Sequence, residues 1–289
     1  MQEDEKKRQT APVVAVVLAA GFGTRFDPEN PKQLVCIGDK PIVCWSIEAF
    51  ERNSRVSDIV VVVNPKVRDA VEGLIDEARY EKVRMVIDGG VERCDSTMAA
   101  LNVLKQAGIP QQAKILIHDA VRPFVSQESI DDSIDTLDEF SAATVAFAST
   151  DTILLTHDAG DRKVIGSVPD RADTFRAQTP QSFRFGTIYH AYELAADDPD
   201  FHPTDDTRVV VDYLPDESVA IVAGSDTNLK VTTMADLPIA ERIPANATQQ
   251  PTKAAARPPT HAIPPAAAAH RAHGRAGRMS VSNSSTRRI

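Results

Sequence analysis

Two cations follow a glycine-bearing turn near the start of the chain. The apolar run 13–18 ends in small residues with Gly21 and Gly23, which is typical of a buried parallel strand that delivers a turn at its carboxyl end. Glycine there lets main-chain N–H groups approach an anion with no Cβ in the way. Arg25 and Lys32 come shortly afterwards. This combination favours chemistry on a polyphosphate, where negative charge is neutralised as it develops.

Two better-known glycine motifs do not fit this turn. A dinucleotide-binding loop requires a third glycine where Phe26 stands, and the pattern Gly-x-x-x-x-Gly-Lys-Ser/Thr is absent. Gly-x-Gly alone also makes tight strand-to-helix turns beside solvated cations. The run becomes specific only together with the sequence Pro31-Lys32-Gln33.

Two further loops carry groups that suit a nucleotide or its phosphates. An apolar run ends at His118 and Asp119, and Arg122 follows, so a carboxylate and a guanidinium share one loop. This pair is either an ion pair that closes the loop or a functional pair whose carboxylate holds Mg²⁺ or a substrate hydroxyl. Gly90 lies in a loop that opens a helix. Ser96 is a plausible cap of that helix, and its free N–H groups suit a nucleotide.

The order of these sequence segments resembles that of one enzyme family. The resemblance includes four later segments, around Arg171, Thr179, Thr204 and Lys230. Over residues 12–242 the chain is similar to the 2-C-methyl-D-erythritol 4-phosphate cytidylyltransferases and to their near relatives, the ribitol-5-phosphate cytidylyltransferases. The resemblance implies that CTP and an alcohol phosphate form a CDP-alcohol and pyrophosphate, with Mg²⁺ as cofactor. For the leading family this is a step of non-mevalonate isoprenoid precursor synthesis.

The resemblance also implies a role for each candidate residue. Arg25 and Lys32 are the expected catalytic cations, and Asp119 is the expected metal ligand. The expected nucleotide-binding residues are Ala19, Ala20, Gly21, Gly23, Gly90, Ser96, Ala120 and Lys230. The substrate phosphate is expected at Asp119, Arg122, Arg171, Thr179, Thr204 and Lys230.

Departures from the family pattern leave alternatives open. Val121, the run 96–98 and the segments 165–171 and 178–183 differ from many methylerythritol enzymes, and the last two look like the pentitol-phosphate branch. A ribitol-5-phosphate cytidylyltransferase is therefore an alternative. So is a non-catalytic module that binds CTP or a CDP-alcohol, although such a module would be marked by loss of the two catalytic cations. A sugar-nucleotide pyrophosphorylase fits the blocks around residues 122 and 230 poorly.

Alternating apolar and helical segments predict the elements that position these groups. Strands are expected at 13–18, 58–63, 83–87, 114–117, 143–147 and 219–222, and helices at 42–52, 67–78, 94–107, 127–140 and 185–196. The sequence predicts an α/β fold with a Rossmann-like, mostly parallel sheet and helices on both faces. Ligands then belong at the carboxyl ends of the strands.

Residues 151–178 break this rhythm and predict an arm. Segments 152–156 and 163–168, with a turn at 157–160, have the pattern of a β-hairpin. Its apolar side chains include Ile153, Leu155, Val164 and Val168, and a lone hairpin is marginal in water. We therefore expect a homodimer in which the arm carries Arg171 and Thr179 to the neighbouring subunit.

Charge divides the 289-residue chain unevenly. Residues 244–289 hold seven of its 32 Lys/Arg and none of its 41 Asp/Glu, so residues 1–243 carry a formal charge of −16. An acidic body argues against nucleic-acid partners, and no apolar run is long enough to cross a membrane. Residues 1–11 and the Ala/Pro/Ser-rich tail 244–289 are expected to be disordered. Three cysteines without Cys-x-x-Cys spacing and the polar N-terminus favour the cytoplasm.

Overall fold

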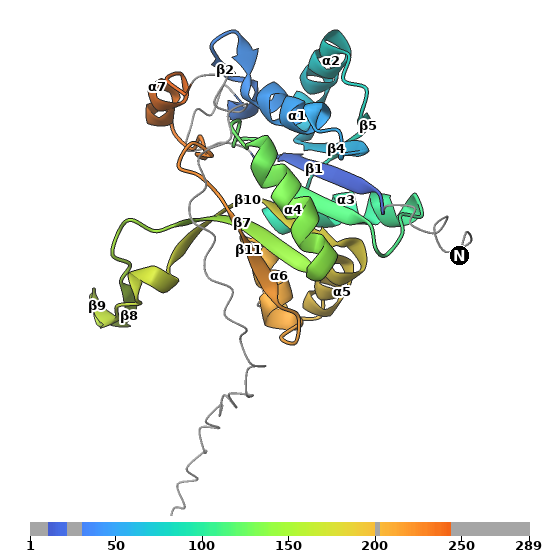
Figure 1. The fold of residues 1–289 in the computed structure, drawn as a ribbon. Coiled ribbons are helices and arrows are strands. Elements are labelled where there is room, and N and C mark those ends of the chain that lie inside the picture. The colour runs from blue at the N-terminus through green and yellow to red at the C-terminus, as the bar shows by residue number, and fades with distance from the viewer. Residues whose placement is uncertain (1–10, 22–30, 200–202, 244–289) are drawn as a thin grey trace, which may run out of the picture. The chain divides into compact units, whose positions relative to one another are not determined.

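The computed structural model describes residues 11–21, 31–199 and 203–243 of the chain (Figure 1). Its largest sheet has seven strands in the order β11-β7-β10-β6-β1-β4-β5. All neighbouring strands are parallel except β10, which runs antiparallel to both β6 and β7. The strands are β1 (Val13–Ala19), β4 (Asp58–Val63), β5 (Val83–Asp88), β6 (Lys114–Asp119), β7 (Ala142–Ala148), β10 (Phe175–Arg184) and β11 (Val219–Ala223).

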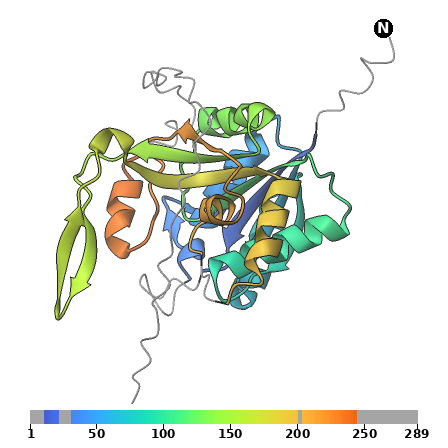
Figure 2. The ribbon, with the colours of Figure 1, turned by 90° about the horizontal axis from the view of Figure 1, so that it is seen from below.

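Helices cover both faces of this sheet (Figures 1 and 2). On β1, Ala15 and Val17 pack in one core with α1, α2 and α4, whereas Val14 and Val16 pack in the other with α3, α5 and α6. Successive strand residues point to opposite faces, so an all-apolar strand is the pattern of a sheet covered twice. The helices are α1 (Ile42–Arg52), α2 (Arg68–Ala78), α3 (Arg93–Gln106), α4 (Gln127–Glu139), α5 (Phe185–Ala195), α6 (Asp206–Tyr213) and α7 (Leu237–Ala240).

The predicted fold class is confirmed, and the predicted strands and helices end within one or two residues of the observed ones. The strand β10, the helix α6 and the short elements β2, β3 and α7 were not predicted. The buried stretch of β10 contains Gln178, Thr179, Gln181 and Ser182, so its interior side chains are polar. A search for apolar runs does not detect such a strand, because residues distant in the sequence supply the partners of Gln178, Thr179 and Gln181.

The predicted hairpin arm is present, but its first strand was placed too early. The strands are β8 (Leu155–Ala159) and β9 (Arg162–Ser167), and the turn between them starts at Gly160, whose φ is +70°. The hairpin projects away from the large sheet (Figures 1 and 2). Its apolar side chains lie open, with Leu155 at 54% and Ile165 at 59% exposure.

A small separate core fixes the last described segment of the chain. Ile37, Ile42, Val121, Phe124 and Val231 are buried together there, close to the short strands β2 (Cys36–Ile37) and β3 (Lys40–Pro41). The backbone N–H of Val231 donates to the carbonyl of Val121 at 2.9 Å. The residue before Val231 is Lys230, so this core sets the position from which that lysine reaches the site.

None of the described helices is long and apolar enough to span a bilayer. The predicted disorder of residues 1–10 and of the tail 244–289 lies outside the described residues and stays a prediction.

Candidate functional site

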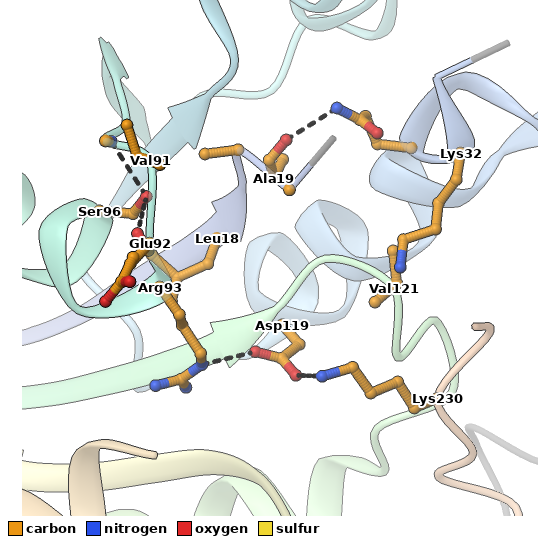
Figure 3. A pocket seen from close by; sticks show the side chains of 14 residues that line it. Leu18, Ala19, Lys32, Val91, Glu92, Arg93, Ser96, Asp119, Val121 and Lys230 are labelled. Carbon is orange, nitrogen blue, oxygen red and sulfur yellow. Dashed lines mark hydrogen bonds and ion pairs between the residues drawn. The ribbon is translucent and has the colours of Figure 1, made fainter. Parts of the chain in front are cut away.

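A cavity of about 180 Å³ opens at the carboxyl ends of β1 and β6 (Figure 3). This is the edge of the sheet at which the sequence placed the ligands. Eight predicted site residues line the cavity, namely Ala19, Ala20, Gly21, Lys32, Gly90, Ser96, Asp119 and Lys230. Other lining residues are Leu18, Gln33, Val91, Glu92, Arg93 and Val121.

The loop before α3 can form one wall only because it carries two glycines. A Cβ at Gly89 would lie 2.4 Å from the Cβ of Ala20, and a Cβ at Gly90 would lie 2.1 Å from the Cβ of Asp95. Glycine at position 89 therefore allows the loop to pack against the residue after β1, and glycine at position 90 allows it to pack against the first turn of α3. At Gly21 an added Cβ would meet nothing within 4 Å, so no contact within the described chain requires glycine there.

Ser96 braces this loop but does not cap the helix, so the predicted cap was wrong. The N-cap is Glu92, whose backbone N–H donates to the Asp95 carboxylate at 2.9 Å. Ser96 lies inside the first turn of α3. Its hydroxyl accepts from the N–H of Gly90 at 3.2 Å and donates to the carbonyl of Glu92 at 3.2 Å. The hydroxyl thus holds the loop against the start of the helix.

A short 3-10 helix (Lys32–Leu34) brings Lys32 to the cavity. Its neighbour Gln33 is buried and donates from Nε2 to the carbonyl of Ala19 at 2.9 Å. This bond ties the lysine segment to the turn after β1. Gln33 was not predicted as a site residue, although it stands in the Pro31-Lys32-Gln33 sequence that carried the family resemblance.

Asp119 lies between three cations, and Figure 3 shows two of them, Arg93 and Lys230. Its Oδ1 accepts from Nε of Arg93 at 3.2 Å and its Oδ2 from Nζ of Lys230 at 2.8 Å, while Nε of Arg122 lies 4.0 Å from Oδ2. Burial alone raises the pKa of the Asp119 carboxyl, but Arg93 and Lys230 hold that pKa well below its usual range. The carboxylate is therefore ionised throughout the physiological range.

This arrangement does not fit a Mg²⁺ ion held by Asp119. Both carboxylate oxygens already accept from cations, and the described residues contain no group of three His, Cys, Asp or Glu side chains that could hold a metal. A divalent cation here would face three positive charges and one carboxylate, which is the reverse of an oxygen-rich magnesium site.

A chain of hydrogen bonds inside the fold joins Thr179 to the Asp119 loop. Nε2 of His118 lies 3.0 Å from the carbonyl oxygen of Arg122, which only accepts, so this nitrogen carries the proton. Nδ1 then accepts from the Thr179 hydroxyl at 2.9 Å, and Thr179 Oγ1 accepts from the N–H of Asp119 at 3.1 Å. The hydroxyl proton of Thr179 is thus already donated to His118, and its predicted contact with a phosphate stays a prediction. The prediction that the arm carries Thr179 to the neighbouring subunit was wrong, because Thr179 is buried in β10 and bonded to the Asp119 loop of its own chain.

His118 is neutral in this chain of bonds. The side chain is completely buried, and burial lowers its pKa to about 4. Arg122 is held on the same loop by main-chain oxygens, donating to the carbonyls of Asn228 at 2.9 Å and Ala177 at 3.3 Å. The loop after β6 is therefore fixed to β10 and to the segment that carries Lys230.

Arg93 is a member of the site that sequence reasoning missed. Its side chain is 20% exposed, and besides Asp119 it donates to Asp206 at 2.5 Å and to Gln181 at 3.2 Å. Burial lowers the pKa of Arg93, but the carboxylates of Asp206 and Asp119 outweigh it, so the guanidinium stays charged. One signal was available: an arginine in the first turn of a helix opposes the helix dipole.

Several predicted residues are not brought to the cavity. Ala120 is fully buried, and its N–H and carbonyl are bonded to Leu18 and Ser46. Arg171 is exposed at the base of the arm, where it donates to the hydroxyl of Thr152 at 3.1 Å. Thr204 is exposed before α6. Gly23 and Arg25 lie outside the described residues.

Comparison with known proteins shows one consistent similarity. A family model described as 2-C-methyl-D-erythritol 4-phosphate cytidylyltransferase matches residues 13–245. A protein of that name from Bifidobacterium longum (strain DJO10A) is 71% identical over 258 residues, which are 89% of each chain. A bifunctional ribulose 5-phosphate reductase/CDP-ribitol pyrophosphorylase from Haemophilus influenzae is 35% identical over 80% of this chain and 48% of its own.

The fold is also found among solved structures. The crystal structure of 4-diphosphocytidyl-2C-methyl-D-erythritol synthase from Anaerococcus prevotii DSM 20548 has a TM-score of 0.68 and 26% identity. The match covers 80% of this chain and 95% of that one.

Proposed function

The chain belongs to the 2-C-methyl-D-erythritol 4-phosphate cytidylyltransferase family, and we propose that it carries out that reaction. It joins CTP and 2-C-methyl-D-erythritol 4-phosphate to give 4-diphosphocytidyl-2-C-methyl-D-erythritol and pyrophosphate, a step of isoprenoid precursor synthesis. This reaction is favoured over that of the pentitol branch, because the methylerythritol relative is 71% identical over 89% of both chains and the CDP-ribitol relative is 35% identical.

The observation that carries the proposal is the composition of one cavity. It joins the turn after β1, the glycine loop before α3 and two lysines, Lys32 and Lys230. The glycine loop presents main-chain groups at a helix start, which suits a base and ribose. The two ammonium groups suit the phosphates of the same nucleotide.

The chemistry follows from this distribution of charge. The alcohol phosphate attacks the α-phosphorus of CTP in line and pyrophosphate departs, so no covalent bond to the protein forms. Lys32, with Arg25, neutralises the charge that develops on the α-phosphoryl oxygens and the leaving group. Lys230 also holds phosphate oxygens, and Asp119 fixes its ammonium.

Magnesium enters with the nucleotide in this proposal. Asp119 is already neutralised by Arg93 and Lys230, so the ion is a counter-ion of the CTP phosphates and belongs to the substrate. The chain's own residues then act by binding and orienting the nucleotide. Asp119 contributes by holding cations.

The acceptor phosphate is proposed to lie between subunits. Arg171 and its partner Thr152 stand at the base of a hairpin whose apolar side chains are open, and a second copy of the chain would cover them. In the homodimer the arm brings Arg171 to the neighbour's cavity. We also propose the cytoplasm as the compartment of the reaction.

Pyrophosphate release with a panel of substrates tests the function. CTP is paired with methylerythritol, ribitol, ribulose and glycerol phosphates, and UTP is paired with methylerythritol phosphate. We expect kcat/KM for methylerythritol phosphate to exceed that for ribitol phosphate by a factor on the order of 10² or more, because a site that hydrogen-bonds hydroxyls leaves polar groups unpaired with the wrong alcohol.

Three outcomes of this assay would contradict the proposal. A preference for ribitol phosphate would assign the chain to the pentitol branch. Equal kcat/KM for CTP and UTP would favour a sugar-nucleotide pyrophosphorylase. CTP binding without turnover on any alcohol would identify a non-catalytic module.

A further inference from the structure

We infer that Asp206 is a positioning residue, which acts through Arg93 and Asp119 to fix the ammonium of Lys230 in the cavity. Asp206 stands at the start of α6, outside the cavity lining, and no resemblance or comparison assigned it a role. The inference rests on the proposed function, since it supposes that Lys230 binds the phosphates of CTP.

A continuous line of charged contacts connects the core to the cavity. The Tyr192 hydroxyl donates to Oδ1 of Asp206 at 2.6 Å, and Oδ2 of Asp206 accepts from Nη1 of Arg93 at 2.5 Å. Nε of the same guanidinium donates to Oδ1 of Asp119 at 3.2 Å, and Oδ2 of Asp119 accepts from Nζ of Lys230 at 2.8 Å. Figure 3 shows the last two contacts side by side at the floor of the cavity.

Burial decreases from Asp206, at the core end of this line of contacts, to Lys230 at the cavity. Asp206 is fully buried, Asp119 and Arg93 are mostly buried, and the Lys230 side chain is 41% exposed. Lys230 has the most exposed side chain of the four, so the place of its ammonium depends on the more buried groups behind it. A flexible lysine held by one carboxylate is only as well placed as that carboxylate.

Asp119 cannot hold itself in place without Arg93. Arg93 contacts one oxygen of its carboxylate and the partly exposed Lys230 contacts the other, while Arg122 is 4.0 Å away. The guanidinium is in turn fixed by Asp206 and Gln181, since the planar fork of an arginine binds several acceptors in one geometry. Removing the charge of Asp206 would free Arg93 to turn toward Asp119 and so shift it.

The same guanidinium also gathers segments that are distant in the sequence. Arg93 begins α3 directly after the glycine loop, Asp119 ends β6, Gln181 lies in β10 and Asp206 begins α6. Gln181 stabilises the contact between Arg93 and Asp206, because its Oε1 accepts both from Arg93 and from the N–H of Asp206, the latter at 3.1 Å. Asp206 thus fixes the nucleotide loop and the phosphate-binding lysine relative to each other.

The test is the variant Asp206→Asn, with Asp205→Asn as its matched control. Asp205 is the adjacent carboxylate and also contacts Gln181, but it does not contact Arg93. We expect kcat/KM for CTP to fall about 10-fold to 100-fold in Asp206→Asn, as misplacement of a binding group by a distant change can do. Asp205→Asn should stay within about threefold of the parent, the range expected of a change that leaves the bound geometry intact.

A double-mutant cycle separates positioning from general scaffolding. In a Lys230→Ala background, Asp206→Asn should lower kcat/KM by less than about threefold further, because the group it positions is gone. Arg93→Lys serves as a second variant if Asp206→Asn does not fold. It keeps the charge but lacks the planar fork that holds both carboxylates in one geometry, so the same loss and the same non-additivity are expected.

Two results would overturn the inference. One is an unchanged kcat/KM in a folded Asp206→Asn variant. The other is that Asp206→Asn lowers kcat/KM in the Lys230→Ala background by the same factor as in the parent. If the parent makes no CDP-alcohol, the proposed function fails instead. The cycle is then measured on the Kd for CTP by calorimetry, with the same non-additivity expected.

Discussion

Asp119 sets the electrostatics of the cavity at the scale of single residues. A carboxylate that faces an acidic ligand would repel it, but this one is neutralised by Arg93 and Lys230 at 3.2 and 2.8 Å. Its strongly lowered pKa means that the carboxylate stays ionised in the physiological pH range. In the proposed function Asp119 therefore holds cations for phosphate, and Lys32 adds a further positive charge to the lining.

Lys32→Ala should lower kcat by a factor on the order of 10²–10³, because removal of one preorganised donor in the transition state costs that much. Arg25→Ala is expected to do the same. Steady-state kinetics at saturating CTP and alcohol phosphate measure the change. Lys105→Ala, an exposed lysine of α3 paired with Glu193 at 3.5 Å, is the control and should keep the parent rate. A Lys32→Ala enzyme within a fewfold of the parent would refute the assigned role.

His118 predicts how stability depends on pH. Its pKa is about 4 in the folded protein and 6.5 in the unfolded chain, so the unfolded chain binds the extra proton between these values. The contribution of His118 to the free energy of unfolding is fully present above pH 6.5. It decreases by about 3 kcal/mol as the pH falls toward 4. Denaturant unfolding of the parent and of His118→Gln, at several pH values, should show a flatter curve for the variant.

The control for this comparison is His190→Gln, since the His190 side chain is 59% exposed. It should keep the pH dependence of the parent. If His118→Gln also kept it, the proton would not be excluded from His118 by burial, and the neutral hydrogen-bond chain to Thr179 would be wrong.

At the scale of elements, the sequence allowed the parallel strands and their helices to be predicted, because burial on two faces requires long apolar runs such as 58–63. It did not reveal β10 or α6. Gln181 and Asp206 are fully buried in these elements, but they are polar and find their partners, Arg93 among them, far along the chain. The periodicity of the sequence does not reveal such long-range contacts. The part of the site that Gln181 and Asp206 form with Arg93 was therefore not predicted.

The arm predicts that active sites are shared between two chains. Arg171→Ala and Lys32→Ala should each be nearly inactive alone. If the subunits exchange, a mixed dimer would contain one site in which both residues are unaltered. Activity should then reappear on mixing, as measured by pyrophosphate release.

An interface variant provides an independent check of the arm. Ile165→Glu changes a side chain that is 59% exposed on β9, so the fold of one chain should tolerate it while the dimer dissociates. Val211→Glu, 52% exposed on α6, is the matched control and should remain dimeric in sedimentation. An active parent monomer, or no recovery of activity despite proven exchange, would rule out shared sites.

At the scale of the whole molecule, the charge of −9 combines a body of −16 with a C-terminal stretch that contains seven Lys/Arg. Every described contact of the cavity lies within residues 18–230. A chain that ends at Ile243 should therefore keep its melting temperature and its kcat. Thermal unfolding and the pyrophosphate assay check both. Loss of most activity or solubility on truncation would show that residues 244–289 contribute to the body.

The most direct measurement of the central claim follows each phosphorus of CTP. The protein is incubated with methylerythritol phosphate and CTP labelled at either the α- or the γ-phosphorus. In-line attack at the α-phosphorus predicts α-label in a CDP-alcohol and γ-label in pyrophosphate, formed in equal amounts. Label that stays in CTP, or γ-label released as orthophosphate, would contradict a cytidylyltransferase.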